Sequence, residues 1–193
     1  MWASPLSLTG KTVSLVPLSQ DHASDLAEAA ADGDLHQLWY TTVPAPQDVS
    51  AEITRRLTLQ DSGSMAPFAI LDRSGRAVGM TTYMNIDAPN RRLEIGSTWY
   101  RRSVQRSGIN TECKRLMLTH AFETLDAIAV EFRPHRLNRQ SRAAIERLGA
   151  QLDGILRAHM ILANGTLRDT AVYSITAAEW PTIRAHLLHL SDR

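Results

Sequence analysis

The chain has 193 residues, of which 44% are hydrophobic and 21% are charged, and its formal net charge is +1. This size suits one domain with its own core, and the near-neutral charge argues against a nucleic-acid binder that relies on bulk positive charge. The single cysteine, Cys113, excludes an internal disulfide, and we see neither zinc-like Cys/His spacing, a signal-peptide pattern nor a membrane-spanning apolar run. We therefore expect a single cytoplasmic domain over residues 1–193.

Hydrophobic periodicity and turn residues divide the first 60 residues into short elements. Ser19 is a suitable N-cap after a strand that Pro17 ends, and Gly33 is a natural stop for the helix that follows. In chain order we expect a strand over residues 12–18, a helix over 21–32, a loop or short helical turn over 35–46, and a helix over 47–60.

The rest of the chain alternates strands with helices. Polar turns separate three strands that should form an antiparallel meander, Asn164-Gly165 is a hairpin signal, and Thr176 to Glu179 is a capping box for the last helix. We expect strands over 67–72, 77–86, 92–100, 127–133, 152–162 and 169–175, and helices over 111–125, 139–148 and after 176. The whole chain is then one α/β unit of about seven strands with interspersed helices.

The stretch VQRSGINTECKRLML, residues 104–118, joins a turn to an amphipathic helix. A turn containing Gly108, followed by a helix that begins near Asn110 or Thr111, would aim several backbone N–H groups at one point. Such a helix start predicts a phosphate site. The loop lacks the Gly-Lys-Ser/Thr ending of a nucleotide P-loop and the three glycines of a dinucleotide fingerprint, so it predicts neither of those sites.

Positive charge gathers around this loop. Residues 91–115 contain seven basic and two acidic residues, and Arg101, Arg102 and Arg106 can supply charge to a phosphorylated ligand. The alternative is a solvated Arg-rich face without a ligand.

The loop Gln105-Arg106-Ser107-Gly108-Ile109-Asn110 resembles the Gln/Arg-x-x-Gly-x-Gly/Ala loop of the GNAT superfamily of acetyl-CoA-dependent N-acetyltransferases. LEIGSTWY (93–100) looks like the fourth strand of that fold, and NRQSRAAIERLGA (138–150) looks like its Asn-x-x-Ser helix. RDTAVYSIT (168–176) with the following EWP is similar to the end of the RimJ/RimL-like (ribosomal-protein N-terminal acetyltransferase-like) branch, which also includes many enzymes of other specificity. Asn110 departs from the usual Gly or Ala, and it is also a good N-cap.

The resemblance implies an α/β (α+β) fold, with a mixed, mostly antiparallel central sheet flanked by helices and splayed between its fourth and fifth strands. It also implies acetyl-CoA as co-substrate and no metal, with pantetheine in the splay and pyrophosphate on the loop amides. The cofactor-binding residues that it implies are Ser97, Thr98, Trp99, Tyr100, Gln105, Arg106, Ser107, Gly108, Ile109, Asn110, Thr111 and Asn138.

Two catalytic roles follow from the same resemblance. Glu94 matches a glutamate that removes the proton of the amine; the alternative is a structural residue paired with Arg91 or Arg92. Ile145 stands where many relatives carry a tyrosine acid. Ser141, in Asn138-x-x-Ser141, matches the serine implied as the acid by the resemblance to RimL-like enzymes, so it is the candidate acid for the departing CoA thiolate. Its alternative role is capping or hydrogen bonding within its own helix.

For the acceptor, the resemblance points to the loop before the second helix and to the third strand, with the candidates His36, Trp39, Tyr40, Tyr83 and Met84. Aromatic residues in these places can equally belong to the core. We expect an N-acetyltransferase that acts on a protein N-terminus or a small-molecule amine by direct attack in a ternary complex, without nucleic-acid or membrane partners. The alternatives are a non-catalytic acyl-CoA sensor and an RNA- or ribosome-associated protein. A homodimer is common among similar enzymes, but no motif encodes it.

Overall fold

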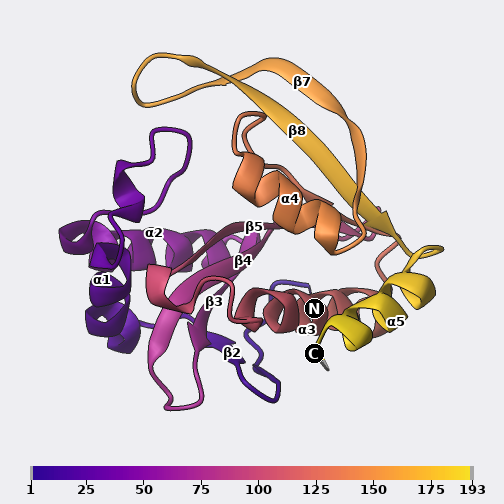
Figure 1. The fold of residues 1–193 in the computed structure, drawn as a ribbon, viewed down its shortest axis with the longest axis horizontal. Helices are drawn as coiled ribbons and strands as arrows, with labels where there is room; N and C mark the ends of the chain where they lie inside the picture. The colour runs from indigo at the N-terminus through magenta and orange to yellow at the C-terminus, as the bar shows by residue number, and fades with distance from the viewer. Residues whose placement is uncertain (1, 192–193) are drawn as a thin grey trace.

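The computed structural model describes residues 2–191, which form one eight-stranded sheet with helices on both faces (Figure 1). The strand order is β1-β2-β3-β4-β5-β6-β8-β7. The strands are β1 Leu8–Thr9, β2 Ser14–Pro17, β3 Met65–Leu71, β4 Ala77–Asp87, β5 Arg92–Tyr100, β6 Ala129–Phe132, β7 Gln151–Ile161 and β8 Leu167–Thr176. The seven expected strands are present, and the additional one is the two-residue β1.

Five α-helices and four short 3₁₀ helices of the described residues connect these strands. The α-helices are α1 Ala23–Ala31, α2 Val49–Asp61, α3 Ile109–Glu123, α4 Arg139–Arg147 and α5 Trp180–Ser191. The 3₁₀ helices are η1 Gln20–His22, η2 Leu35–Gln37, η3 Pro46–Asp48 and η4 Arg102–Val104. Across residues 2–191, every helix is too short or too polar to cross a membrane.

The sheet is antiparallel except between β5 and β6, which pair in parallel. That parallel ladder contains only three pairs, Arg92↔Ala129, Leu93↔Val130 and Glu94↔Glu131. β5 continues to Tyr100 without a further partner on β6. The predicted splay between these two strands is therefore confirmed, and it begins immediately after Glu94.

Two hydrophobic cores cover the two faces of the sheet. The larger one packs α3, α4 and α5 against the sheet and includes Phe68, Tyr83, Leu93, Ile95, Met117 and Ile145. The smaller one lies under α1 and α2 and includes Leu26, Ile53, Ala69, Met80 and Trp99. Because side chains alternate along a strand, Leu93 and Ile95 on β5 point into the larger core, and Glu94 between them points to the opposite face.

The helix starts match the predicted capping only in part. The amide of Ser19 donates to Nδ1 of His22 at 3.1 Å, and the carboxylate of Glu179 accepts from the amide and hydroxyl of Thr176 at 2.8 and 2.7 Å. The prediction that Asn110 caps α3 is wrong. Gly108 is the N-cap, at φ 87°, a conformation that glycine adopts without a steric penalty, and this places Asn110 in the first turn.

Candidate active site

A β-bulge interrupts β5 within its splayed half. Thr82 pairs with Gly96 and Met80 pairs with Trp99, so the single residue Thr81 on β4 faces both Ser97 and Thr98 on β5. Ser97 has φ 48°, which is rare for a residue other than glycine. Such bulges redirect the backbone of a strand and are frequent next to functional sites.

Arg56 reaches the bulge from α2 and is almost completely buried, with 1% of its surface exposed. Its Nε donates to the carboxylate of Glu52 at 2.7 Å, and its Nη1 donates to the hydroxyl of Thr82 at 2.6 Å. Both terminal nitrogens also lie 3.4 Å from the carbonyl oxygen of Ser97. The guanidinium therefore links α2 to β4 and to the bulged backbone of β5.

Glu94 lies where the β5–β6 ladder ends, and only 6% of it is exposed. Its Oε2 accepts a hydrogen bond from Nδ2 of Asn85 at 2.7 Å. A Cβ atom added to Gly96 would lie 2.8 Å from Oε1 of Glu94, so the carboxylate extends along β5 toward the bulge. Burial raises the pKa of Glu94, and the hydrogen bond from Asn85 offsets part of this effect.

The predicted structural alternative for Glu94, a pair with Arg91 or Arg92, is wrong. Arg91 pairs with Asp126 and Arg92 with Glu131, because both arginines lie beside β6 and the turn before it. The nearest cation to Glu94 is Arg133, at 3.9 Å. A cavity of about 120 Å³ adjoins the carboxylate and is lined by Asn85, Asp87, Arg92, Leu93, Glu94 and Glu131.

The loop before α3 has the geometry expected of a phosphate site. Arg106 and Gly108 both adopt left-handed conformations, with φ 65° and 87°. No atom lies within 4 Å of a Cβ added at Gly108, so the space over this glycine is open. The side chain of Gln105 holds the loop by donating to the carbonyl oxygen of Tyr100 at 3.2 Å. The first amides of the 15-residue α3 therefore begin at an exposed, glycine-capped turn, which favours an anionic ligand.

Most of the positive charge around this loop is neutralised by ion pairs. In the described residues, Arg91, Arg92, Arg101 and Arg115 pair with Asp126, Glu131, Asp32 and Glu112. Lys114 is buried, with 5% of its surface exposed, whereas Arg106 is exposed. The excess of basic residues over positions 91–115 therefore does not form a continuous basic surface, which disfavours the RNA-binding alternative.

On α4, Asn138 and Ser141 occupy neighbouring positions at the start of the helix. Oδ1 of Asn138 caps the helix by accepting from the amide of Ser141 at 3.0 Å. Ser141 therefore takes part in the helix cap through its amide, whereas its hydroxyl makes no hydrogen bond within residues 2–191. The hydroxyl of Thr111 on α3 accepts from Arg147 on α4 at 2.9 Å, which leaves its amide for the phosphate role.

The loop between α1 and α2 brings Trp39 and Tyr40 against His135, which follows β6. The ring centroids of Trp39 and Tyr40 lie 5.3 and 6.3 Å from that of His135. His135 is 4% exposed; its Nδ1 accepts from the amide of Leu137 at 3.0 Å, and its Nε2 has no partner among the described residues. Burial lowers the pKa of His135, which keeps the ring neutral.

The other three candidate acceptor residues lie elsewhere. Tyr83 belongs to the core, because it is 0% exposed and its hydroxyl donates to the carbonyl oxygen of Met117 at 2.6 Å. Sδ of Met84 lies 3.7 Å from the hydroxyl of Ser97 at the bulge. His36 is on η2, and its Nδ1 is buried without a partner among residues 2–191. Tyr83 is therefore a core residue rather than an acceptor contact.

Sequence patterns did not identify Arg56, Lys114 or His135. Each of them is a polar side chain that long-range packing buries beside the splayed strands, and such burial leaves no local signal in the sequence. The amide of Asn85 is a fourth such group, because its contact with Glu94 depends on the β4–β5 register.

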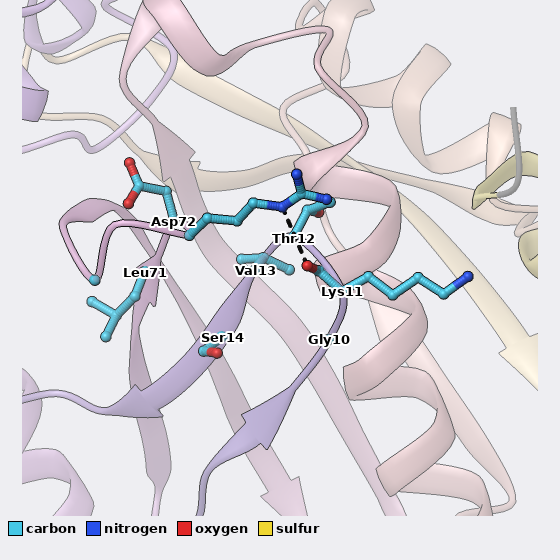
Figure 2. A pocket seen from close by; sticks show the side chains of 9 residues that line it. Gly10, Lys11, Thr12, Val13, Ser14, Leu71 and Asp72 are labelled. Carbon is cyan, nitrogen blue, oxygen red and sulfur yellow. Dashed lines mark hydrogen bonds between the residues drawn. The ribbon is translucent and has the colours of Figure 1, made fainter.

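A larger hollow, of about 350 Å³, lies between the β1–β2 turn and the β3–β4 turn, away from these residues (Figure 2). Arg73 and Lys11 border it, and Nε of Arg73 donates to the carbonyl oxygen of Lys11 at 3.3 Å. None of its lining residues is a site candidate. No three His, Cys, Asp or Glu side chains in the described part of the chain are grouped so that they could hold a metal ion.

Comparison with known proteins gives concordant matches. Residues 12–151 match the family model described as an acetyltransferase (GNAT) domain. YdaF of Bacillus subtilis (strain 168), whose assigned name proposes a ribosomal N-acetyltransferase, is 35% identical over 106 residues. This alignment covers 55% of the present chain and 57% of YdaF, so it spans little more than half of that relative.

Solved structures are similar over almost the whole chain. A GCN5-related N-acetyltransferase from Brucella melitensis is 32% identical with a TM-score of 0.87, and the match covers 96% of this chain and 85% of that one. RimJ of Mycobacterium smegmatis, solved with CoA-disulfide, is 26% identical with a TM-score of 0.79, and the match covers 98% and 94% of the two chains.

Proposed function

The chain belongs to the acetyltransferase (GNAT) domain family, and on this premise we propose that it transfers the acetyl group of acetyl-CoA to a primary amine. The amine attacks the thioester directly within a ternary complex. The acceptor is a protein N-terminus or a small-molecule amine. The name of YdaF, which proposes a ribosomal N-acetyltransferase, supports a protein acceptor, and the family match supports acetyl transfer itself.

The splay between β5 and β6 is the observation that carries this proposal. From Ile95 to Tyr100, one edge of β5 pairs with β4 and the other has no ladder to β6. An extended pantetheine arm can lie along that edge as an added strand would. The same strand leads through η4 into the open turn at Gly108, where the pyrophosphate can accept from the first amides of α3.

The amine must be neutral to attack. An α-amine with a pKa of about 7.8 is roughly one-third neutral at pH 7.5, whereas a lysine with a pKa of about 10.4 is only about 0.1% neutral. An N-terminal acceptor therefore needs only a modest base. Glu94 suits this role, because its carboxylate extends toward the bulge and its raised pKa increases its proton affinity. Backbone amides at the bulge can stabilise the oxyanion that develops on the thioester.

Trp39, Tyr40 and His135 provide the acceptor contacts in this proposal. Trp39 is 50% exposed, so its ring offers an apolar surface, and the unpaired Nε2–H of His135 offers a hydrogen-bond donor. Both belong to segments that meet at the splayed side of the sheet, since one precedes α2 and the other follows β6.

The first test is calorimetric titration of acetyl-CoA into the protein, followed by mass-spectrometric detection of acetylated products from N-terminal peptides, polyamines and aminoglycosides. We expect binding of acetyl-CoA and acetylation of at least one amine class. Binding without product across the panel would favour the sensor alternative. Absence of binding would contradict the proposal.

Gly108→Val tests the placement of the pyrophosphate. A side chain at this position projects into the open space over the loop, so we expect at least a tenfold weaker affinity for CoA. Gly63→Val is the matched control, because Gly63 also has a left-handed conformation (φ 77°) with nothing within 4 Å and lies after α2. Equal CoA affinity in the two folded variants would refute the placement.

A further inference from the structure

Lys114, one of the two lysines of the chain, is a buried cation without an ionic partner among residues 2–191. Its ammonium donates to the hydroxyl of Thr98 on β5 at 2.6 Å and to the hydroxyl of Thr81 on β4 at 3.1 Å. No carboxylate of the described residues pairs with it. A buried charge that only hydroxyl groups solvate is costly to keep, and an anion nearby would stabilise it.

The other titratable groups around Lys114 are neutral near pH 7. They are Tyr83 on β4, Tyr100 on β5 and Cys113 on α3, and burial raises the pKa of each. Glu112 on α3 faces away, toward Thr12 and the amide of Lys11. Burial lowers the pKa of Lys114 from 10.5 to about 8, so this ammonium can release a proton in the range in which a thiol ionises.

The donors and acceptors around Lys114 indicate which way the hydroxyl proton of Thr98 can point. An ammonium only donates, so both threonine hydroxyls accept from Lys114. The hydroxyls of Thr81 and Thr98 lie 2.7 Å apart, so one of them donates to the other. Thr81 is completely buried, whereas Thr98 is half-buried and follows Ser97 in the splayed part of β5. When Thr81 donates to Thr98, the hydroxyl proton of Thr98 is left to the carbonyl oxygen of Gly96, at a long 3.4 Å on the splayed part of β5, and a ligand sulfur in the splay can compete for it.

We propose that Lys114 and Thr98 form a proton relay that protonates the departing CoA thiolate. This inference rests on the proposed function. The amine nitrogen bonds to the acetyl carbon, the carbon–sulfur bond breaks, and its electron pair moves to sulfur. Thr98 donates its hydroxyl proton to the sulfur and receives one from Lys114, which water later reprotonates. The proton lost by the amine goes to Glu94. Thr98 contacts the leaving group, and Lys114 is the positioning residue that acts through it.

The decisive measurement is the pH dependence of kcat, from acetylated product at saturating substrates. The wild-type kcat should fall above about pH 8 as Lys114 loses its proton. Lys114→Met should reduce kcat at least tenfold, remove that alkaline limb and leave the Kd of acetyl-CoA within a factor of two. Lys11→Met is the control, because it removes the other lysine from an exposed loop, and it should keep the wild-type profile.

If Lys114→Met does not fold, the variants Thr98→Val and Thr98→Ser test the proposed proton relay instead. Valine removes the hydroxyl and should reproduce the loss of kcat and of the alkaline limb, and serine should restore both. A wild-type alkaline limb and kcat in folded Lys114→Met or Thr98→Val would overturn the relay. Failure of the proposed function would appear differently, as a wild-type protein that binds acetyl-CoA and yields no product.

Discussion

Four buried polar side chains surround the point where β5 separates from β6. Glu94, Arg56, Lys114 and His135 are each at most 6% exposed, and they come from β5, α2, α3 and the segment after β6. Burying polar or charged groups costs stability unless they are fully paired. Among the described residues, Nε2 of His135 has no partner, and the charge of Lys114 is solvated by two hydroxyl groups and by no carboxylate. Such groups together in one place are typical of a functional site rather than of a core that only stabilises the fold.

Glu94→Gln separates the catalytic role of this residue from a structural one. Removing a general base lowers turnover by about 10²–10⁴-fold, so we expect a loss in this range with little change in the Kd of acetyl-CoA. Burial raises the pKa of Glu94 in the folded state above its value in the unfolded chain. The folded protein is therefore stabilised when Glu94 is protonated, and it loses this stabilisation as pH rises through the folded-state pKa and the carboxylate ionises. The Tm of the variant at pH 7 should therefore not fall.

Glu131→Gln provides the complementary test. Glu131 is opposite Glu94 in the β5–β6 ladder, and its negative charge contributes to raising the pKa of Glu94. Its removal should lower the pKa of Glu94 and move the acidic limb of kcat to lower pH. A large loss of Tm in Glu94→Gln with unchanged kcat would leave only a structural role.

At the scale of elements, the bulge of β5 depends on α2, a helix that packs on one face of the sheet. Arg56 on α2 donates to both Thr82 and the carbonyl oxygen of Ser97, so its planar fork fixes the strand at the bulge. Lysine keeps the positive charge but lacks the planar guanidinium that bonds to Thr82 and Ser97 at the same time. The bulge would then be held less firmly, so Arg56→Lys should lower kcat/KM about tenfold or more.

The matched control is Arg55→Lys. Arg55 pairs with the same carboxylate, that of Glu52 at 2.7 Å, but it is exposed and does not contact β5. Its substitution should leave kcat/KM within a factor of two. Comparable losses in the two folded variants, measured as initial rates, would show that the ion pair with Glu52, rather than the bulge contact, matters.

The sequence predicted elements well where the signal is local. The strand over residues 92–100, the Asn164-Gly165 hairpin and the splay implied by the family resemblance were all confirmed. The bulge at Ser97 was not predicted, because a positive φ at serine has no sequence signature. The cap of α3 was assigned to Asn110, since its side chain is a good cap, whereas the backbone conformation at Gly108 decided the outcome. The contacts of Lys114 and His135 join segments far apart in the chain, so no pattern predicts them.

At the scale of the whole molecule, the β5–β6 ladder joins the two parts of the sheet through only three residue pairs. β1 to β5 lie on one side of this junction, and β6, β8 and β7 lie on the other. A hydrogen bond from Arg147 on α4 to the hydroxyl of Thr111 on α3, at 2.9 Å, also links the two parts. A ligand in the splay would contact both parts, so its binding should stabilise the folded chain as a unit.

CoA should therefore raise the Tm, and the size of the shift follows from mass action. At a ligand concentration of 100 Kd, stability increases by about 2.7 kcal/mol, which corresponds to roughly 5–10 °C for a domain of this size. Differential scanning fluorimetry with CoA and acetyl-CoA measures this shift, and Gly108→Val at the same concentrations should lose most of it. Desulfo-CoA should give a comparable shift, since the relay of Lys114 and Thr98 acts on the sulfur only during turnover. A shift that persists undiminished in Gly108→Val would place the ligand outside the splay.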